Sequence, residues 1–146
     1  MKILTYLFAC LTLLAVAAGC GGSSTVRADE EQTVERAVQA ALDGERAEFV
    51  TLVAPSFLEE ARAEMPDAGD ETLGGILIAG FLEDIPFAGI EDAAYEVEAT
   101  GDKAAVYLWG TFRDSAGAYM EISEAEALRI PLIRENGRWY IDLLDL

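Results

Sequence analysis

The feature that most constrains the fold is a change in the spacing of apolar residues near residue 90. Before it, they recur every three or four positions, as Val34, Ala37 and Ala41 do, which gives one stripe along a helix. From Glu91 onward apolar and polar residues alternate, which indicates strands with one buried face. This order predicts an α+β domain in which N-terminal helices pack on a curved antiparallel sheet.

Helix-stop residues divide the first part of the chain into four expected helices. Asp29 and Asp70 suit the N-cap positions of the first and the fourth. The expected ranges are residues 29–43, 49–53, 57–65 and 70–82. Residues 73–82 carry no charge, so the fourth helix is either a lid over a pocket, a segment that touches lipid or a partner, or a helix buried on two sides. We favour the last, and ten residues cannot span a bilayer.

Alternation and turn signals predict about four strands. Their expected ranges are residues 93–100, 104–113, 118–134 with a break near 123–124, and 138–144. The turn Asn136-Gly137 is a typical two-residue hairpin loop. Pro131 has no N–H for a ladder hydrogen bond, so we expect a bulge or a gap in pairing there.

The charge balance excludes several functions. The sequence has 27 acidic and 10 basic residues and a formal net charge of −17, and such a domain repels nucleic acid. Histidine is absent, which excludes histidine-based triads and histidine-containing zinc sites. Acidic clusters near Asp29 and Asp70 lack the calcium-loop pattern and lie where acids stabilise helix starts. We therefore expect no metal, no other cofactor and no nucleic-acid partner.

The first 28 residues have the layout of an export signal with an anchor. Lys2 precedes an apolar run over residues 3–18, and the small residues Ala17, Ala18 and Gly19 lie directly before Cys20. The run is shorter than the ~20 residues that span a bilayer. Glycine and serine dominate the residues that follow, which suits a flexible tether.

Ala17-Ala18-Gly19-Cys20 resembles the lipobox of bacterial lipoproteins, in which the signal is cut before a cysteine that carries lipid. The resemblance implies a signal peptide over residues 1–19, a lipidated Cys20 with a tether over 20–28, and a single domain over 29–146. It also implies a lipid-anchored protein on the extracytoplasmic face of the cell membrane. The alternatives are an ordinary signal peptide or an uncleaved membrane helix, with Cys20 incidental.

Two motifs in the sheet carry a further resemblance. Gly101-Asp102-Lys103, with the small and apolar residues that follow, and Gly137-Arg138-Trp139, with the aromatic and isoleucine after them, look like the nuclear-transport-factor-like superfamily, whose cystatin-like fold also includes ketosteroid isomerases. The resemblance implies a cone-shaped domain with an open mouth. Proteins of this superfamily include isomerases, dehydratases and non-catalytic binding or dimerising domains.

A pocket in such a cone is one candidate site. The residues expected to line it are Tyr95 on a strand and Leu77, Phe81 and Asp84 at the fourth helix. A small apolar ligand would fit there. An isomerase- or dehydratase-like enzyme would need a carboxylate beside a tyrosine with shifted pKa values. No spacing pairs such groups, so we assign no catalytic residue and expect a non-catalytic binding domain.

The outer face of the sheet is the second candidate site. Aromatic and arginine side chains are enriched at the centres of protein interfaces. We expect the residues Tyr107, Trp109, Arg129, Ile133 and Tyr140 to share this face. It would bind a cell-envelope protein or a second copy of the chain. The sequence thus predicts a membrane-anchored lipoprotein with an interaction domain, and a dimerising subunit of an envelope assembly is an alternative.

Overall fold

Four helices precede the sheet, as the sequence predicts. The computed structural model describes residues 28–146, so the predicted signal peptide and Cys20 lie outside the described residues. The helices are α1 (Asp29–Asp43), α2 (Arg46–Leu52), α3 (Pro55–Glu64) and α4 (Asp70–Glu83). The expected N-caps are wrong by one position: Ala28 and Gly69 hold them, and the two aspartates lie in the first turns. No helix formed by residues 28–146 is long and apolar enough to cross a bilayer.

The strands form one antiparallel sheet. They are β1 (Gly89–Thr100), β2 (Lys103–Arg113), β3 (Tyr119–Ile122), β4 (Leu128–Glu135) and β5 (Arg138–Ile141). Their order is β1-β2-β4-β5, and β3 pairs with the end of β2. A short 3-10 turn, Glu124–Glu126, separates β3 from β4. The predicted α+β class, with helices on a curved antiparallel sheet, is confirmed, and so is the break near residue 123.

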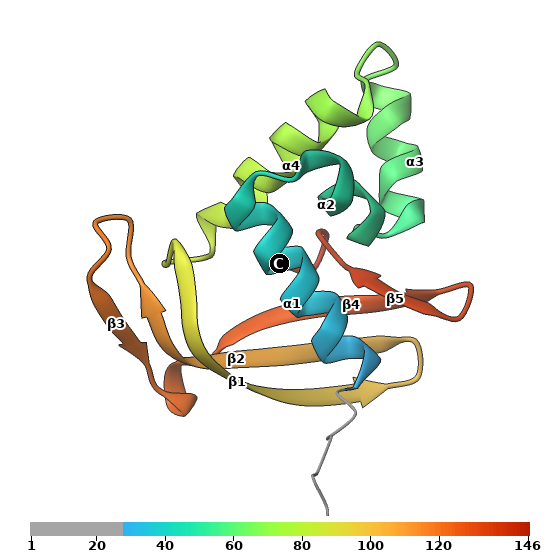
Figure 1. Ribbon diagram of the computed structural model, residues 1–146. Coiled ribbons are helices and arrows are strands. Elements are labelled where there is room, and N and C mark those ends of the chain that lie inside the picture. The colour runs from blue at the N-terminus through green and yellow to red at the C-terminus, as the bar shows by residue number, and fades with distance from the viewer. Residues whose placement is uncertain (1–27) are drawn as a thin grey trace, which may run out of the picture.

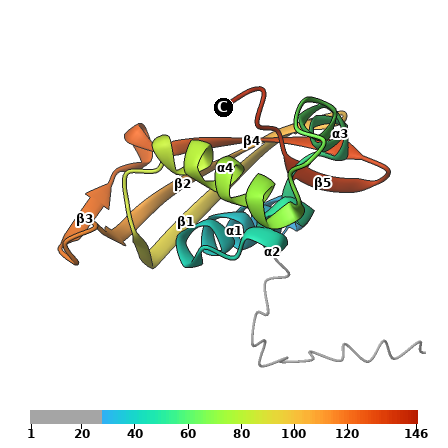
Figure 2. The same cartoon turned by 90° about the horizontal axis from the view of Figure 1, so that it is seen from above.

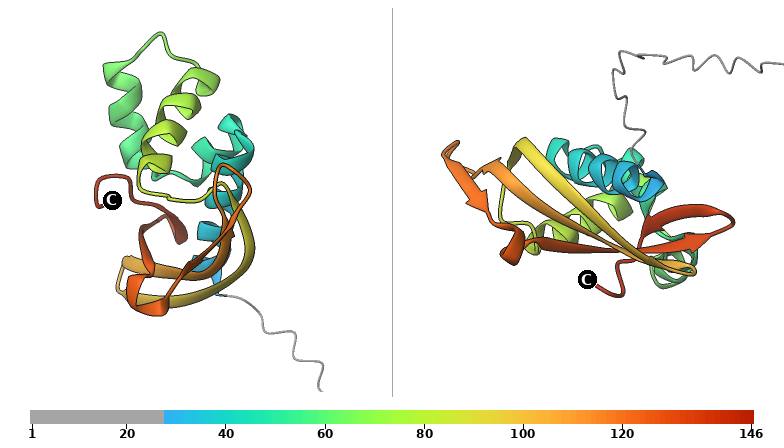
Figure 3. Two further views of the ribbon diagram at one scale, coloured as in Figure 1. Left: turned by 90° about the vertical axis from the view of Figure 1, so that its left-hand side faces the viewer. Right: turned by 90° about the horizontal axis from the view of Figure 1, so that it is seen from below.

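The sheet curves around α1, which lies across its concave face (Figure 1; Figure 3, left). Val34 and Val38 of α1 are fully buried, and so are Val106, Leu108 and Phe112 of β2. They belong to one continuous core that also includes Leu132 of β4 and Ile141 of β5. Each buried side chain of this size contributes roughly 1.5–3 kcal/mol to the free energy of unfolding, so the concave face is held by α1.

Helices α3 and α4 extend beyond the sheet (Figure 1), and seen from above α4 lies between α1 and β4 (Figure 2). One face of α4 packs on α2, where the rings of Phe49 and Phe81 lie 5.2 Å apart. Its other face is only partly covered: 50% of the surface of Ile76 is exposed to solvent, and Gly80 is exposed as well. The expectation of a helix buried on two sides is therefore wrong, because α4 stands past the sheet edge (Figure 1) and its second face stays partly exposed.

Of the bulge or gap in pairing expected at Pro131, the β2–β4 ladder shows neither, whereas the β4–β5 pairing ends at Leu132, next to Pro131. Pro131 faces Ala105 in an unbroken β2–β4 register. Its carbonyl oxygen accepts a hydrogen bond from the N–H of Asp142 at 3.0 Å, on the side of β4 away from β2. The amide and carbonyl of one residue in an antiparallel strand point to the same side. An N–H on Pro131 would therefore point toward β5, which has already ended at Ile141. The β2–β4 ladder thus lacks no hydrogen bond because of the proline.

Candidate ligand-binding sites

An apolar groove of about 410 Å³ lies between α3, α4 and the C-terminal segment, residues 142–146. We call it the α3–α4 groove. Two of its lining residues are large apolar side chains with much exposed surface, Ile76 at 50% and Leu146 at 44%. The volume is within the range of small-molecule pockets, which are mostly apolar with a few polar groups. The lining residues are Phe57, Ile76, Leu77, Gly80, Phe81, Asp84, Leu143 and Leu146.

The C-terminal segment forms one wall of this groove because it is fixed to the β4 edge. Asp142 is buried, with 7% of its surface exposed, and its carboxylate lies 3.6 Å from the ammonium of Lys103. Arg129 donates to the side chain of Asp145 at 2.9 Å and to its carbonyl oxygen at 3.1 Å. These bonds to β2 and β4 hold Leu143 and Leu146 beside α3 and α4.

Leu77, Phe81 and Asp84 were predicted to line a pocket in the cone, but they line the α3–α4 groove instead, and α1 lies across the concave face of the sheet (Figure 1). Tyr95 does not line this groove. Tyr95 pairs with Leu108 in the sheet and packs, half-buried, against the core on the concave face. The tyrosine and the carboxylate that an isomerase-like site would combine thus belong to different surroundings.

The predicted outer-face residues lie on one face of the sheet. Tyr107 is opposite Arg129, and Ile133 is opposite Tyr140, while Trp109 is two residues along β2 from Tyr107. Tyr140 is buried, however, whereas the other aromatics are half-buried. Acidic side chains of β1 share this face, since Glu96 pairs with Tyr107 and Glu98 with Ala105. The face is therefore mixed aromatic and acidic.

Hydrogen bonds within the chain already engage two of these residues. The Tyr107 hydroxyl donates to Glu98 at 3.1 Å, and this bond is the main reason that the pKa of Tyr107 is raised above 10.0. The bonds to Asp145 raise the pKa of Arg129, and the guanidinium of Arg129 lowers the pKa of Asp145 below 3.8. A partner on this face would meet a pre-formed polar network.

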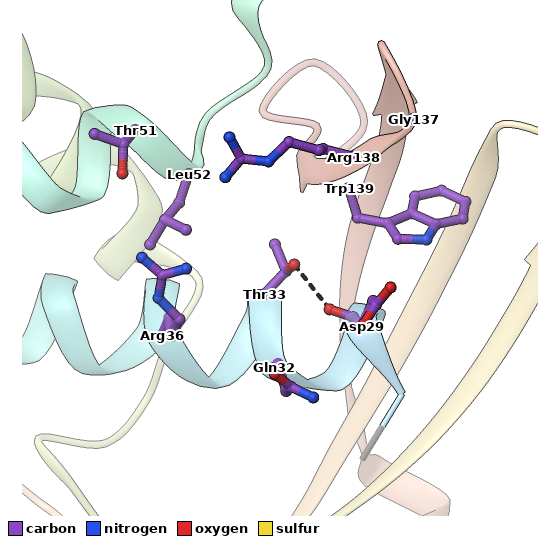
Figure 4. Close-up of a pocket in the computed structure, with 9 residues that line it drawn as sticks. All are labelled: Asp29, Gln32, Thr33, Arg36, Thr51, Leu52, Gly137, Arg138 and Trp139. Atoms are coloured by element: carbon purple, nitrogen blue, oxygen red, sulfur yellow. Dashed lines mark hydrogen bonds between the residues drawn. The ribbon is translucent and has the colours of Figure 1, made fainter. Parts of the chain in front are cut away.

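A third site, a polar pocket of about 200 Å³, lies between α1, the end of α2 and the β4–β5 hairpin (Figure 4). We call it the arginine pocket, because Arg36 and Arg138 line it from opposite sides. The sequence analysis did not predict it: the two arginines are about a hundred positions apart, and only the fold brings them together. Its other lining residues are Asp29, Gln32, Thr33, Thr51, Leu52, Gly137 and Trp139.

Residues 28–146 contain no group of three or more acidic or cysteine side chains placed to hold a metal ion. The acidic residues of the first turns, such as Asp29 and Asp70, instead lie where they interact with the helix dipoles.

Fold and sites define an α+β domain with an apolar groove beside a half-barrel sheet. No family model and no curated relative matches the sequence. Two solved structures are similar. A SEC-C motif-containing protein from Rhodopseudomonas palustris is 16% identical, with a TM-score of 0.46 over 80% of this chain and 78% of that one. A protein from Campylobacter jejuni described as an NTF2-like transpeptidase is 12% identical, with a TM-score of 0.48 over 78% of this chain and 97% of that one.

Proposed function

We propose that this chain is a lipid-anchored extracytoplasmic protein whose domain binds a small apolar ligand in the α3–α4 groove. The observation that carries the binding part is the groove itself, with about half of the surface of Ile76 and of Leu146 left exposed. Exposed apolar surface gathered in a concavity is characteristic of ligand or partner sites. A ligand that covers both side chains would gain roughly 25 cal/mol per Å² of apolar surface removed from water.

The position of the groove suits an anchored protein. The anchor rests on the lipobox-like sequence before Cys20, and α1 begins at Asp29, nine residues later. The 15 residues of α1 span roughly 22 Å. Helices α3 and α4, which line the groove, lie near the end of α1 that is far from Asp29 (Figure 1). A short tether at Asp29 would thus place the groove away from the membrane surface.

A neutral fluorescent apolar probe, N-phenyl-1-naphthylamine, tests the groove. Gly80 lines the groove, and a Cβ there would meet nothing within 4 Å. A leucine at this position would fill the cavity without disturbing the core. We expect Gly80→Leu to weaken probe binding about tenfold or more. Unchanged binding to Gly80→Leu would overturn the proposed site.

A matched pair of exposed residues supplies the control. Ile76→Ser removes an exposed apolar side chain from the groove, whereas Leu144→Ser removes one that is 73% exposed and does not line it. Only Ile76→Ser should weaken the binding of the probe. Equal loss in both variants would mean that the probe follows general surface hydrophobicity.

Cys20→Ser tests the anchor. Lipid attachment of two or more chains gives stable membrane binding, so the wild-type protein should fractionate with membranes and the variant should be released. A mass spectrum of the mature protein should start at a lipidated Cys20. Unchanged fractionation of the variant would contradict lipidation and would leave the groove proposal standing.

Two alternatives remain predictions. A homodimer or an envelope partner could use the outer face, and Tyr107, Trp109 and Arg129 would then be its centre. An isomerase- or dehydratase-like activity finds less support, because Tyr95 and Asp84 lie in different surroundings. Light scattering during size-exclusion chromatography separates the dimer from the monomeric ligand-binding form.

A further inference from the structure

We propose that the arginine pocket is a second binding site, and that it takes a small oxyanion, a phosphate or a carboxylate. The pocket lies by the N-terminal half of α1 and does not share residues with the α3–α4 groove. Arg36 of α1 and Arg138 of β5 extend toward the same end of it, near the end of α2 (Figure 4). Two guanidinium groups on one cavity are a common arrangement for binding oxyanions.

Among residues 28–146, five of the eight basic side chains form an ion pair with a carboxylate, and Arg46, Arg134 and Arg138 do not. With a formal net charge of −17, carboxylates are available to most basic side chains, and Arg62, Lys103, Arg113 and Arg129 each form an ion pair. Within residues 28–146, Arg138 has no carboxylate within ion-pair distance. The contact it does make is with the ring of Tyr140, at 5.6 Å. Its guanidinium is therefore available to an external anion.

Arg36 is positioned by an ion pair that uses only part of its capacity. Its Nη2 donates to Glu48 of α2, which fixes the side chain across the two helices. A guanidinium has five N–H donors, and the bond to Glu48 takes one of them. The remaining donors can bind a ligand without breaking this bond.

The other polar groups of the pocket show how a ligand would be oriented. Thr33 donates its hydroxyl hydrogen to the carbonyl of Asp29 at 2.9 Å, and Thr51 donates its own to the carbonyl of Glu48 at 2.7 Å. Both hydroxyl oxygens can then only accept from a ligand. The Asp29 carboxylate lies at the end of the pocket away from the two guanidinium groups (Figure 4). The oxyanion thus belongs at the arginine end, which alone supplies charged donors.

Calorimetric titration of the full mature protein with inorganic phosphate, and separately with succinate, tests the proposal at low salt. We expect saturable binding of at least one of them. Arg138→Gln should weaken it about tenfold or more, the effect of losing one charge-assisted hydrogen bond. The anion that binds more tightly identifies which oxyanion the pocket prefers.

Arg62→Gln is the matched control, since it removes the same charge from an arginine that pairs with Asp70 outside the pocket. It should change the affinity less than twofold. Equal weakening by both variants, or no saturable heat with either anion up to about 10 mM, would overturn the proposal. The indole resonance of Trp139, which lines the pocket, should shift with the bound anion, whereas the resonance of Trp109 should not.

Discussion

Gly74 of α4 lies directly on the backbone of Arg46 in α2. A Cβ at position 74 would be only 2.5 Å from the Arg46 carbonyl oxygen, which is closer than two such atoms can approach. The absence of a side chain at Gly74 therefore sets how closely the two helices pack. This contact places the buried face of α4 against α2 and leaves Ile76 and Gly80 on the groove side.

Gly74→Ala should lower the free energy of unfolding by about 1–3 kcal/mol, the usual cost of forcing extra atoms into a packed contact. Gly80→Ala is the control in the same helix, because a Cβ there meets nothing within 4 Å. It should raise stability by up to about 1 kcal/mol through helix propensity alone. Urea unfolding of both variants measures the difference. Equal effects would show that α2 and α4 pack less closely than described.

Gly110→Ala should be more damaging. Gly110 has a φ of 129°, and a Cβ there would lie 2.2 Å from the carbonyl oxygen of Asp92, beside the irregularity between Ile90 and Asp92 in the β1–β2 register. Strained backbone costs about 1–3 kcal/mol, and the clash adds to it. Gly117→Ala measures the cost of the positive φ alone, because Gly117 also has a positive φ but open space around it. The midpoint temperature of thermal unfolding should be clearly lower for Gly110→Ala than for Gly117→Ala.

The spacing of apolar residues predicts the helices and strands well, because buried positions recur at a fixed interval along each kind of element. The strand faces follow directly from the alternation in β2, and Asn136-Gly137 correctly predicts the last hairpin, which joins Glu135 to Arg138. Helix starts are less certain from sequence. Asp29 and Asp70 suit both the N-cap and the first turn, and only the backbone angles distinguish these positions.

The sites are harder to predict, because each combines distant segments. Phe57, Ile76 and Leu146 come from α3, α4 and the C-terminal segment, and no local pattern relates them. One usable signal for the groove was the pair of apolar residues Leu143 and Leu146, which lie past the end of β5. The two faces of α4 could not be distinguished by composition, because both are apolar. The contact of Gly74 with α2 and the position of α4 beyond the sheet (Figure 1) decide which face is exposed.

Tyr107 should titrate at a higher pH than a free tyrosine. Its hydroxyl donates to the Glu98 carboxylate, and ionisation would break that bond and bring two negative charges together, so the pKa is raised. The bond stabilises the fold fully below pH ~10, the pKa of an unfolded tyrosine, and is lost as pH rises through the higher folded pKa. Ultraviolet absorbance titration should show one tyrosine shifting toward 10 in Glu98→Gln. An identical titration curve in both proteins would contradict the hydrogen bond.

Asp145 should stabilise the protein only while it is ionised. Arg129 lowers the pKa of Asp145 in the folded state, chiefly through their hydrogen bond. A lowered folded pKa gives stability that is present above the unfolded value of ~3.9 and is lost as pH falls through the folded value. The difference in free energy of unfolding between wild type and Asp145→Asn should thus be constant above pH ~5 and shrink in more acidic solution. A difference that stays the same down to pH ~2 would show that the ion pair does not form.

The same variant links the ion pair to the α3–α4 groove. Leu146 follows Asp145 directly and lines the groove. Asp145→Asn should therefore loosen this wall of the groove and lower the affinity for the apolar probe at neutral pH. Arg113→Gln is the control, since it breaks the exposed pair with Glu91 at the other end of β2. Because both pairs are exposed, the measurements belong at low ionic strength, where screening is weakest. Probe affinity that falls equally in both variants would point to a general loss of stability, whereas a loss confined to Asp145→Asn would show that Arg129 holds the groove wall in place.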